Sequence, residues 1–218
     1  MGTSVKNSLR NKRVLVTCGP TWVAIDPVRV ISNRSTGELG HQIASELKNA
    51  GAKVTLLEGP VTHPLKSKGI RIFPFRFFGE LKEILKRELR HPFACIIHAA
   101  AVSDFQPART LQNKLESLSS GLTLKLVPTE KLIRWINRAA PKTFLIGFKL
   151  DTNSSKSTLL KKTRKLIKES SCDWVVANSV KEKEYQGFIL NNEAKVLGQA
   201  RSRKQMAKTL IRLLREKI

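Results

Sequence analysis

The sequence predicts an α/β fold: a Rossmann-like three-layer α/β/α sandwich around a mostly parallel sheet. Short apolar runs alternate along the chain with segments of helical periodicity. Several of these runs are almost uniformly apolar, which is typical of strands buried on both faces. With 218 residues, 41% of them hydrophobic, the chain can bury one large core. We therefore expect a single domain over residues 13–218, preceded by an N-terminal tail over residues 1–12.

The first expected unit is strand, helix, strand. The run VLVTC at 14–18 is followed by a Gly-Pro turn, a polar loop and a helix-period segment at 37–50, which Gly51 closes. KVTLLEG at 53–59 predicts the next strand. Such a βαβ unit implies parallel pairing with a right-handed crossover.

The alternation continues to six strands in all, and a basic helix ends the chain. The further strands are expected at 70–75, 93–100, 143–148 and 173–178, and the further helices at 79–90, 156–168 and 201–217.

Two segments interrupt the alternation. Residues 101–128 form a long connection with a short strand pattern, LTLKLV, at 122–127. GFILNNEAKVLG at 187–198 predicts a hairpin that turns at Asn191-Asn192. Long insertions in compact domains usually serve function or assembly.

The chain is strongly basic. Forty Lys and Arg residues against 17 Asp and Glu give a formal charge of +23, which favours anionic partners. The basic helices at 156–168 and 201–217 carry apolar residues at helical spacing, so we interpret their charges as solvated faces. Docking on nucleic acid is the weaker alternative, because no RRM-like or zinc-finger signature accompanies the charge. That alternative predicts tight binding that weakens steeply with salt.

The cysteines and the apolar runs indicate a reduced, intracellular protein. Cys18, Cys95 and Cys172 show no CxxC spacing and sit in or beside apolar runs, so we expect buried thiols. No apolar run approaches the roughly 20 residues that span a bilayer, and the start MGTSVKNSLRNK lacks the apolar segment of a secretory signal. We expect a soluble cytoplasmic protein with no membrane partner.

Ligands of an open parallel sheet bind beyond the carboxyl ends of its strands. Four segments follow expected strands in this way, and we expect them to converge. They are residues 19–21 with the polar stretch after them, 99–104, 149–151 and 178–179.

The polar stretch VRVISNRSTGELGHQ is suited to holding a phosphate. Ser35 or Thr36 can cap the following helix, while Gly37 lets an anion approach the free N–H groups. Arg29 and Asn33 would add a charged fork and a neutral amide. An ordinary N-cap with Arg29 in solvent explains the pattern equally well on spacing alone. Neither GxGxxG nor GxxxxGK[ST] is present, which argues against a nicotinamide-dependent reductase.

The other strand ends are individually weak signals. Asp104 could coordinate magnesium, accept a hydrogen bond from a ribose hydroxyl, or cap a turn. Lys114, ten residues on, has the surroundings of a surface lysine. The histidines show no metal-ligand spacing, and no Ser-His-Asp or Cys-His arrangement can be argued from residue order.

Taken together, the motifs resemble a known family. The chain resembles the phosphopantothenoylcysteine synthetases, also called phosphopantothenate–cysteine ligases, in motifs that occur in the same order and approximate spacing. These motifs are VTCGPTWVAIDPVRVISNRSTGELG, HAAAVSDFQP, LKLVP, IGFKLDT and DWVVANS. The resemblance begins near residue 13 and passes the sixth strand. It implies a Rossmann-like fold and homodimers that share active sites through the extension over 101–128.

The resemblance also implies a two-step ligation in coenzyme A synthesis. The carboxylate of 4′-phosphopantothenate attacks the α-phosphate of CTP or ATP, supplied with Mg²⁺, and pyrophosphate leaves. The amine of cysteine then displaces the nucleotide from the acyl-nucleotide. This chain has KLES where many bacterial members carry a KIKK-like element, and GFKLDT where they carry GFAAET. Both differences favour the eukaryotic type of the family, so the choice between CTP and ATP is open. No flavin is expected, because the upstream decarboxylase domain of many bacterial members has no counterpart here.

Site residues follow from the resemblance position by position. Asn33 would hold the acyl intermediate, and Lys114 would neutralise phosphate charge in the first step. Arg29 lies in the substrate-binding element. The stretch Ser35, Thr36 and Gly37 completes the expected substrate site, and the expected nucleotide contacts are Gly19, His98, Ala99, Ala100, Ala101, Asp104, Phe148 and Lys165. The alignment is loose around Lys165.

Overall fold

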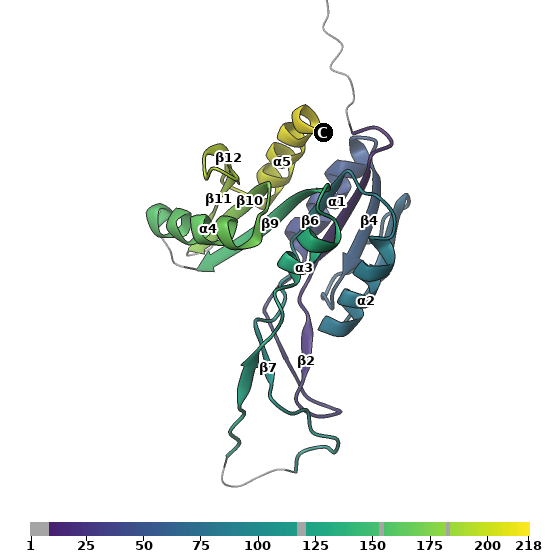
Figure 1. Ribbon diagram of the computed structural model, residues 1–218, viewed down its shortest axis with the longest axis vertical. Helices are drawn as coiled ribbons and strands as arrows, with labels where there is room; N and C mark the ends of the chain where they lie inside the picture. Colours follow the sequence, from purple (N-terminus) through teal and green to yellow (C-terminus); the bar gives the residue numbers. More distant parts are fainter. Residues whose placement is uncertain (1–8, 117–120, 153–154, 182–183) are drawn as a thin grey trace, which may run out of the picture.

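The computed structural model describes residues 9–116, 121–152, 155–181 and 184–218, which build one twisted eight-stranded sheet (Figure 1). Its order is β12-β11-β10-β9-β6-β1-β4-β5. The parallel strands are β1 (Arg13–Cys18), β4 (Lys53–Glu58), β5 (Ile70–Pro74), β6 (Cys95–His98), β9 (Phe144–Thr152) and β10 (Trp174–Lys181). All six expected strands are confirmed, five of them inside the sheet and β5 at its edge.

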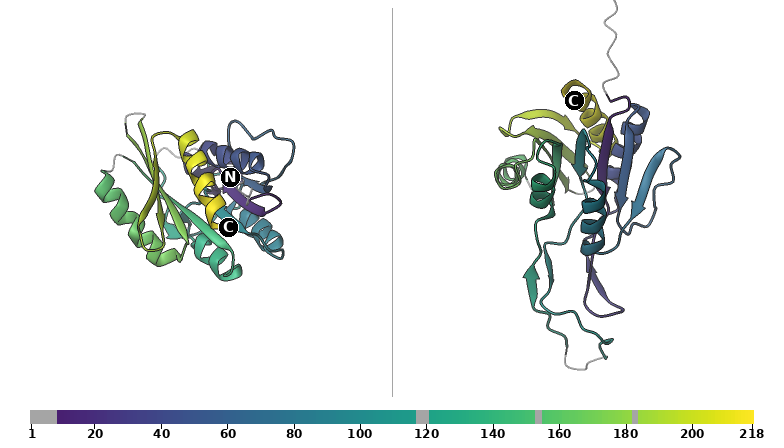
Figure 2. Two further views of the ribbon diagram at one scale, coloured as in Figure 1. Left: turned by 90° about the horizontal axis from the view of Figure 1, so that it is seen from above. Right: turned by 45° about the vertical axis from the view of Figure 1, so that its right-hand side comes forward.

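Helices cover both faces of the sheet, which confirms the three-layer fold (Figure 2). One face packs under α1 (Glu38–Asn49) and α5 (Arg203–Lys217), and the other under α2 (Phe78–Glu88), α3 (Leu132–Ala139) and α4 (Lys156–Ser170). Four of these helices were expected. The short α3 was not, because eight residues give too little periodicity to stand out.

The basic helices expose their charges as expected. In α5, Leu210 and Leu214 are buried, while Lys204, Lys208 and Arg212 lie on the solvent side. The same division holds in α4, whose buried residues are Leu159, Thr163, Ile167 and Ser170.

An antiparallel hairpin extends the parallel sheet at one edge, as predicted. β11 (Glu184–Asn191) pairs with both β10 and β12 (Val196–Ala200). The hairpin turns where expected, directly after Asn191, with a loop over 192–195. The Asn191 side chain accepts a hydrogen bond from the Lys195 N–H at 2.8 Å, and Ala194 takes a positive φ of 62°.

Two short ribbons project from the sheet and lie side by side (Figures 1 and 2). β2 (Trp22–Ala24) pairs with β3 (Val30–Ser32), and β7 (Phe105–Pro107) pairs with β8 (Leu126–Pro128). We call the described parts of residues 22–32 and 105–128 the arm. Only the end of the strand pattern at 122–127 forms a strand, because its partner β7 is three residues long. The β2–β3 hairpin was not predicted.

The core begins earlier than the expected domain boundary at residue 13. Leu9 is fully buried in the core on the α1 side, and the Asn11 N–H donates to the carbonyl of Gly51 at 2.9 Å. The last residues of the expected tail therefore belong to the packed domain. Residues 1–8 of that tail lie outside the described residues.

The three cysteines are buried free thiols, as expected. Among the described residues, no helix has the length and apolarity that crossing a membrane requires.

Candidate active site

A cavity of about 440 Å³ lies at the carboxyl ends of β1, β6, β9 and β10, where α1 begins. We call it the strand-end pocket. The four segments expected to converge do so here. Its lining residues are Cys18, Asn33, Arg34, Ser35, Thr36, Gly37, Glu38, Leu39, Gly40, Ala99, Ala100, Ala101, Phe148, Leu150, Asn178, Val180 and Arg203. The crossover connections of a parallel sheet bring these distant segments to one edge.

The start of α1 forms one wall of the pocket without a side-chain cap. Gly37 is the N-cap residue in a left-handed conformation (φ 71°), and no side chain caps the helix. The expectation that Ser35 or Thr36 is the N-cap residue is therefore wrong, since the left-handed turn at Gly37 starts the helix one residue later. The Thr36 hydroxyl still accepts a long hydrogen bond from the Glu38 N–H at 3.4 Å. Ser35 and Thr36 still line the pocket. The uncapped end leaves the positive pole of α1 open to an anion.

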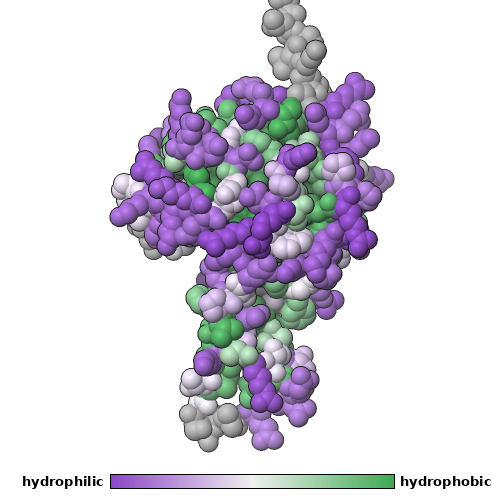
Figure 3. Space-filling view, in the orientation of Figure 1, coloured by the Kyte–Doolittle hydropathy of each residue, from purple (hydrophilic) through white to green (hydrophobic). Residues whose placement is uncertain are grey.

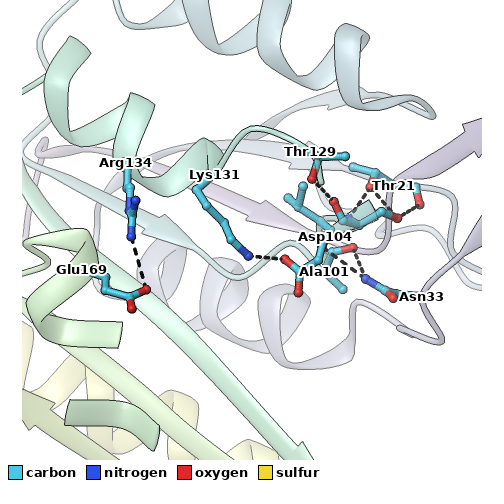
Figure 4. Close-up of polar contacts among 10 residues, drawn as sticks. Thr21, Asn33, Ala101, Asp104, Thr129, Lys131, Arg134 and Glu169 are labelled. Carbon is cyan, nitrogen blue, oxygen red and sulfur yellow. Dashed lines mark hydrogen bonds and ion pairs between the residues drawn. The ribbon is translucent and has the colours of Figure 1, made fainter. Parts of the chain in front are cut away.

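Asn33 ties two pocket walls together. Its Nδ2 donates to the carbonyls of Ala101 at 3.2 Å and Val102 at 3.3 Å (Figure 4). A carbonyl only accepts hydrogen bonds, so the network assigns the amide nitrogen to that side. To donate to a substrate oxyanion, Asn33 has to release at least one of these carbonyls.

The segment after β6 is fixed from behind by backbone hydrogen bonds. The Ala101 N–H donates to the carbonyl of Gly19 at 2.8 Å, and the Thr21 N–H donates to the carbonyl of Ala101 at 3.3 Å. Gly19 has φ 76° and lies against Gly37 beside the pocket, although it is absent from the lining. Ala99, Ala100 and Ala101 do line the pocket, where small side chains leave space.

His98 lies behind the pocket and not in it. Its Nδ1 is 2.9 Å from the hydroxyl of Thr17, which accepts a hydrogen bond from the Ala100 N–H at 3.2 Å. Burial lowers the pKa of His98 to about 4, so the ring is neutral at physiological pH. The expected direct nucleotide contact is not found in this geometry, because the ring points into the core. His98 instead positions the segment after β6 through Thr17.

The buried His98 predicts a pH-dependent stability. The unfolded chain has an ordinary histidine pKa of about 6.5 and takes up the proton first as the pH falls. The free energy of unfolding should therefore fall by about 3 kcal/mol between about pH 6.5 and 4, with no contribution above pH 6.5. Urea unfolding across this range should show a flatter profile in His98→Asn. The exposed His63→Asn is the matched control, and an unchanged slope in His98→Asn would contradict the assignment.

Asp104 and Lys165 lie outside the strand-end pocket. The carboxylate of Asp104 is mostly exposed and pairs with Lys131 at 2.6 Å (Figure 4). Lys165 is exposed, 3.8 Å from Glu169, beside a depression of about 270 Å³ between α3 and α4. Lys149 and Lys162 also line that depression. Asp104 as a magnesium residue therefore stays a prediction, and its carboxylate is paired with Lys131 in this structure.

Arg29 and Lys114 lie on the arm. The guanidinium of Arg29 donates to the Asp26 carboxylate at 2.5 Å and to the carbonyl of Leu115 at 3.1 Å, and the Leu115 N–H returns a bond to Asp26 at 3.0 Å. Burial opposes ionisation of Asp26. The N–H groups of Leu115, Val28 and Arg29 and the guanidinium outweigh it and hold the pKa of Asp26 well below its ordinary value. Arg29 is therefore ion-paired although its side chain is 38% exposed, and Lys114 is exposed. Neither residue lines the pocket of its own chain.

Sequence reasoning missed two notable lining residues, Arg203 and Cys18. Arg203 opens α5 and lies 3.5 Å from the Glu38 carboxylate, and Cys18 ends β1 in the pocket floor. Spacing gives no signal for Arg203, because its place depends on α5 packing against α1 on the same face of the sheet.

Comparison with known proteins fits this site. Residues 9–215 match the family described as the DNA/pantothenate metabolism flavoprotein C-terminal domain. The chain belongs to this family. A structure of the DNA/pantothenate metabolism flavoprotein from Streptococcus pneumoniae is similar, with a TM-score of 0.84, 25% identity, and coverage of 95% of this chain and 100% of that one.

Two curated relatives of this family member are named as coenzyme A biosynthesis proteins. The bifunctional protein CoaBC of Thermococcus kodakarensis is 38% identical over 176 residues, which cover 80% of this chain and 43% of the relative. CoaBC of Borreliella burgdorferi is 31% identical and covers 96% and 54%. The chain thus spans about half the length of these relatives. A Cab2 mutant in complex with phosphopantothenate-cysteine has the same fold, with a TM-score of 0.77, 21% identity, and coverage of 95% of this chain and 87% of that one.

Proposed function

We propose that this family member is a phosphopantothenate–cysteine ligase of coenzyme A biosynthesis. The observation that carries the proposal is the strand-end pocket, in which the family-like SNRSTG stretch and the alanines after β6 lie together. The relatives named CoaBC support the pathway. The Cab2 complex supports phosphopantothenate and cysteine as the joined substrates.

The first step activates a carboxylate. An oxygen of the phosphopantothenate carboxylate attacks the α-phosphorus of the nucleoside triphosphate, the P–O bond to the β-phosphate breaks, and pyrophosphate leaves. Because the product is a mixed anhydride, its acyl carbon now carries a leaving group. The open end of α1 at Gly37 favours the phosphates, and the small Ala100 and Ala101 leave room for the nucleotide. Phe148 offers an apolar surface for the base.

The second step forms the amide. The neutral amine of cysteine attacks the acyl carbon, the nucleoside monophosphate leaves, and the ammonium of the adduct loses a proton. Charge develops on the acyl oxygen in the transition state, where a neutral donor such as Asn33 stabilises it without a proton transfer.

Magnesium enters with the triphosphate in this proposal. Glu38 is the carboxylate that lines the strand-end pocket among the described residues, and Arg203 already pairs with it. Oxygen ligands for the ion then come mainly from the phosphates and from water, which is usual for Mg²⁺. CTP and ATP are both retained as co-substrates.

The assay is direct. Purified protein is mixed with phosphopantothenate, cysteine, Mg²⁺ and either CTP or ATP, and pyrophosphate and the mass of the product are measured. We expect both with at least one nucleotide. If neither nucleotide gives pyrophosphate, the proposed function is wrong.

We also propose that two copies pair through the arm. Its exposed apolar residues are Val28, Val30, Phe105, Leu122 and Leu126, between 38% and 64% exposed. Figure 3 shows hydrophobic surface on the arm among polar neighbours. A cluster of this kind on a projecting element is typical of an interface. The arm would carry Arg29 and Lys114 to the partner's pocket, which explains why neither lines its own.

Removal of two arm residues should separate the dimer. Each large apolar side chain buried at an interface contributes about 1.5–3 kcal/mol, so the double variant Phe105→Ser/Leu126→Ser should weaken the dimer by roughly 10²–10⁴-fold. Light scattering across a concentration series measures this. Val196→Ser, 41% exposed on β12, is the matched control. A wild-type monomer at all concentrations would contradict the proposal.

Shared sites also predict complementation between inactive chains. A mixture of Arg29→Ala and Asn33→Asp chains should regain about a quarter of wild-type activity, because half of the dimers are mixed and each has one intact site. No recovery after subunit exchange would place both residues in the same chain's site.

A further inference from the structure

A compact group of metal-ligating side chains lies next to the strand-end pocket, which one of its members, Cys18, lines. The donor atoms of Cys18, His41 and Glu58 all lie within 4.8 Å of one another. In the part of the chain that the structure describes, this is the one group of at least three such residues. Neither the ligation chemistry nor the nucleotide site proposed above uses it.

The fold itself brings the three residues together. Cys18 and Glu58 end β1 and β4 and are paired directly across these parallel strands. His41 lies in the first turns of α1, which packs tightly on β1 at Gly40. Cys18 is 1% exposed, and the side chains of Glu58 and His41 are 8% and 14% exposed.

The imidazole nitrogen of His41 faces a carboxylate without a well-aligned hydrogen bond. His41 Nε2 lies 2.7 Å from Glu58 Oε1, yet it has no hydrogen bond of acceptable geometry within the described residues. Glu58 Oε1 already accepts the N–H of Leu65 at 2.9 Å. A buried ring nitrogen that faces a carboxylate without a well-aligned bond is suited to a shared cation.

The donor set selects the kind of cation. Sulfur and imidazole nitrogen favour zinc and similar d-block ions, whereas Mg²⁺ prefers oxygen alone. Tetrahedral zinc with bonds of about 2.0–2.3 Å places its donors about 3.3–3.8 Å apart. Separations from 2.7 Å up to 4.8 Å require side-chain shifts of roughly 1 Å to meet this range.

We propose that Cys18, His41 and Glu58 bind one zinc-type divalent ion, with a fourth position left for water or a pocket ligand. Bound there, the ion links β1, β4 and α1 and stiffens the wall of the strand-end pocket. This metal site does not depend on the proposed ligase function, because its test measures metal binding alone.

The experiment uses the full chain after treatment with a chelator. Zn²⁺ is titrated by calorimetry in the presence of excess Mg²⁺, and Co²⁺ is added in parallel as a spectroscopic probe. We expect one ion per chain, no displacement by Mg²⁺, a higher melting temperature, and a cobalt–thiolate charge-transfer absorption. Cys18→Ser should abolish that absorption. It should also weaken zinc binding by at least roughly 100-fold, since loss of outer-shell partners alone costs 10–100-fold.

Matched variants separate the site from adventitious binding. Cys172→Ser removes another buried thiol, and His91→Asn removes an exposed imidazole; both should bind zinc as the wild type does. His41→Asn and Glu58→Gln should each weaken binding, with folding checked by circular dichroism without metal. The absence of saturable zinc binding by the wild type, or full binding by folded Cys18→Ser, would overturn the proposal.

Discussion

Asn33→Asp should release pyrophosphate at a near-normal rate while product formation falls by about 10²–10³-fold, the usual loss when an oxyanion donor is removed. The substitution conserves size but exchanges the amide nitrogen for an acceptor. The new carboxylate would face the carbonyls of Ala101 and Val102, to which Asn33 now donates. Its charge would also oppose negative charge developing on the acyl oxygen.

Two readouts separate the steps. Pyrophosphate reports activation, and the mass of the amide product reports transfer to cysteine. Asn192→Asp, the same chemical change on the exposed β11–β12 loop, is the matched control. If pyrophosphate and product fall together at an unchanged melting temperature, Asn33 acts in the first step and our role for it is wrong. Lys114→Gln should lose pyrophosphate and product together, because we assign Lys114 to the first step.

Gly40→Ala should lower the free energy of unfolding by about 3 kcal/mol, at the upper end of the cost of overpacking a core. An added Cβ would lie 2.3 Å from the Cβ of Cys18. The backbone fixes the position of both Cβ atoms, so neither can rotate away, and α1 has to move off β1. The same movement would widen the strand-end pocket and should weaken nucleotide binding.

Gly79→Ala is the control for this prediction. Gly79 lies in α2, and an added Cβ there meets nothing within 4 Å. Alanine should raise stability there by about 0.5–1 kcal/mol, because it restricts the unfolded chain. Urea unfolding measures both variants. Equal effects at the two positions would show that the contact with Cys18 is relieved at little cost.

The site was predictable in its location and less so in its membership. The rule that ligands lie beyond the ends of parallel strands found the pocket, and the SNRSTG and alanine segments do line it. The same rule could not orient individual side chains. His98 turns into the core toward Thr17, and Asp104 turns outward to Lys131. Residue order alone does not determine whether such a side chain points into the pocket, into the core or into solvent.

The sequence by itself determined the layered architecture, because uniform apolar runs and helical periodicity are local patterns that survive without knowledge of partners. It therefore predicted six parallel strands, the edge hairpin and four helices. Only the tertiary structure decided the arm. Its strands are three residues long, and it is held by contacts across the chain, such as Asp26 with Leu115. Pairing at that separation depends on the whole fold, and so does the meeting of Cys18, His41 and Glu58.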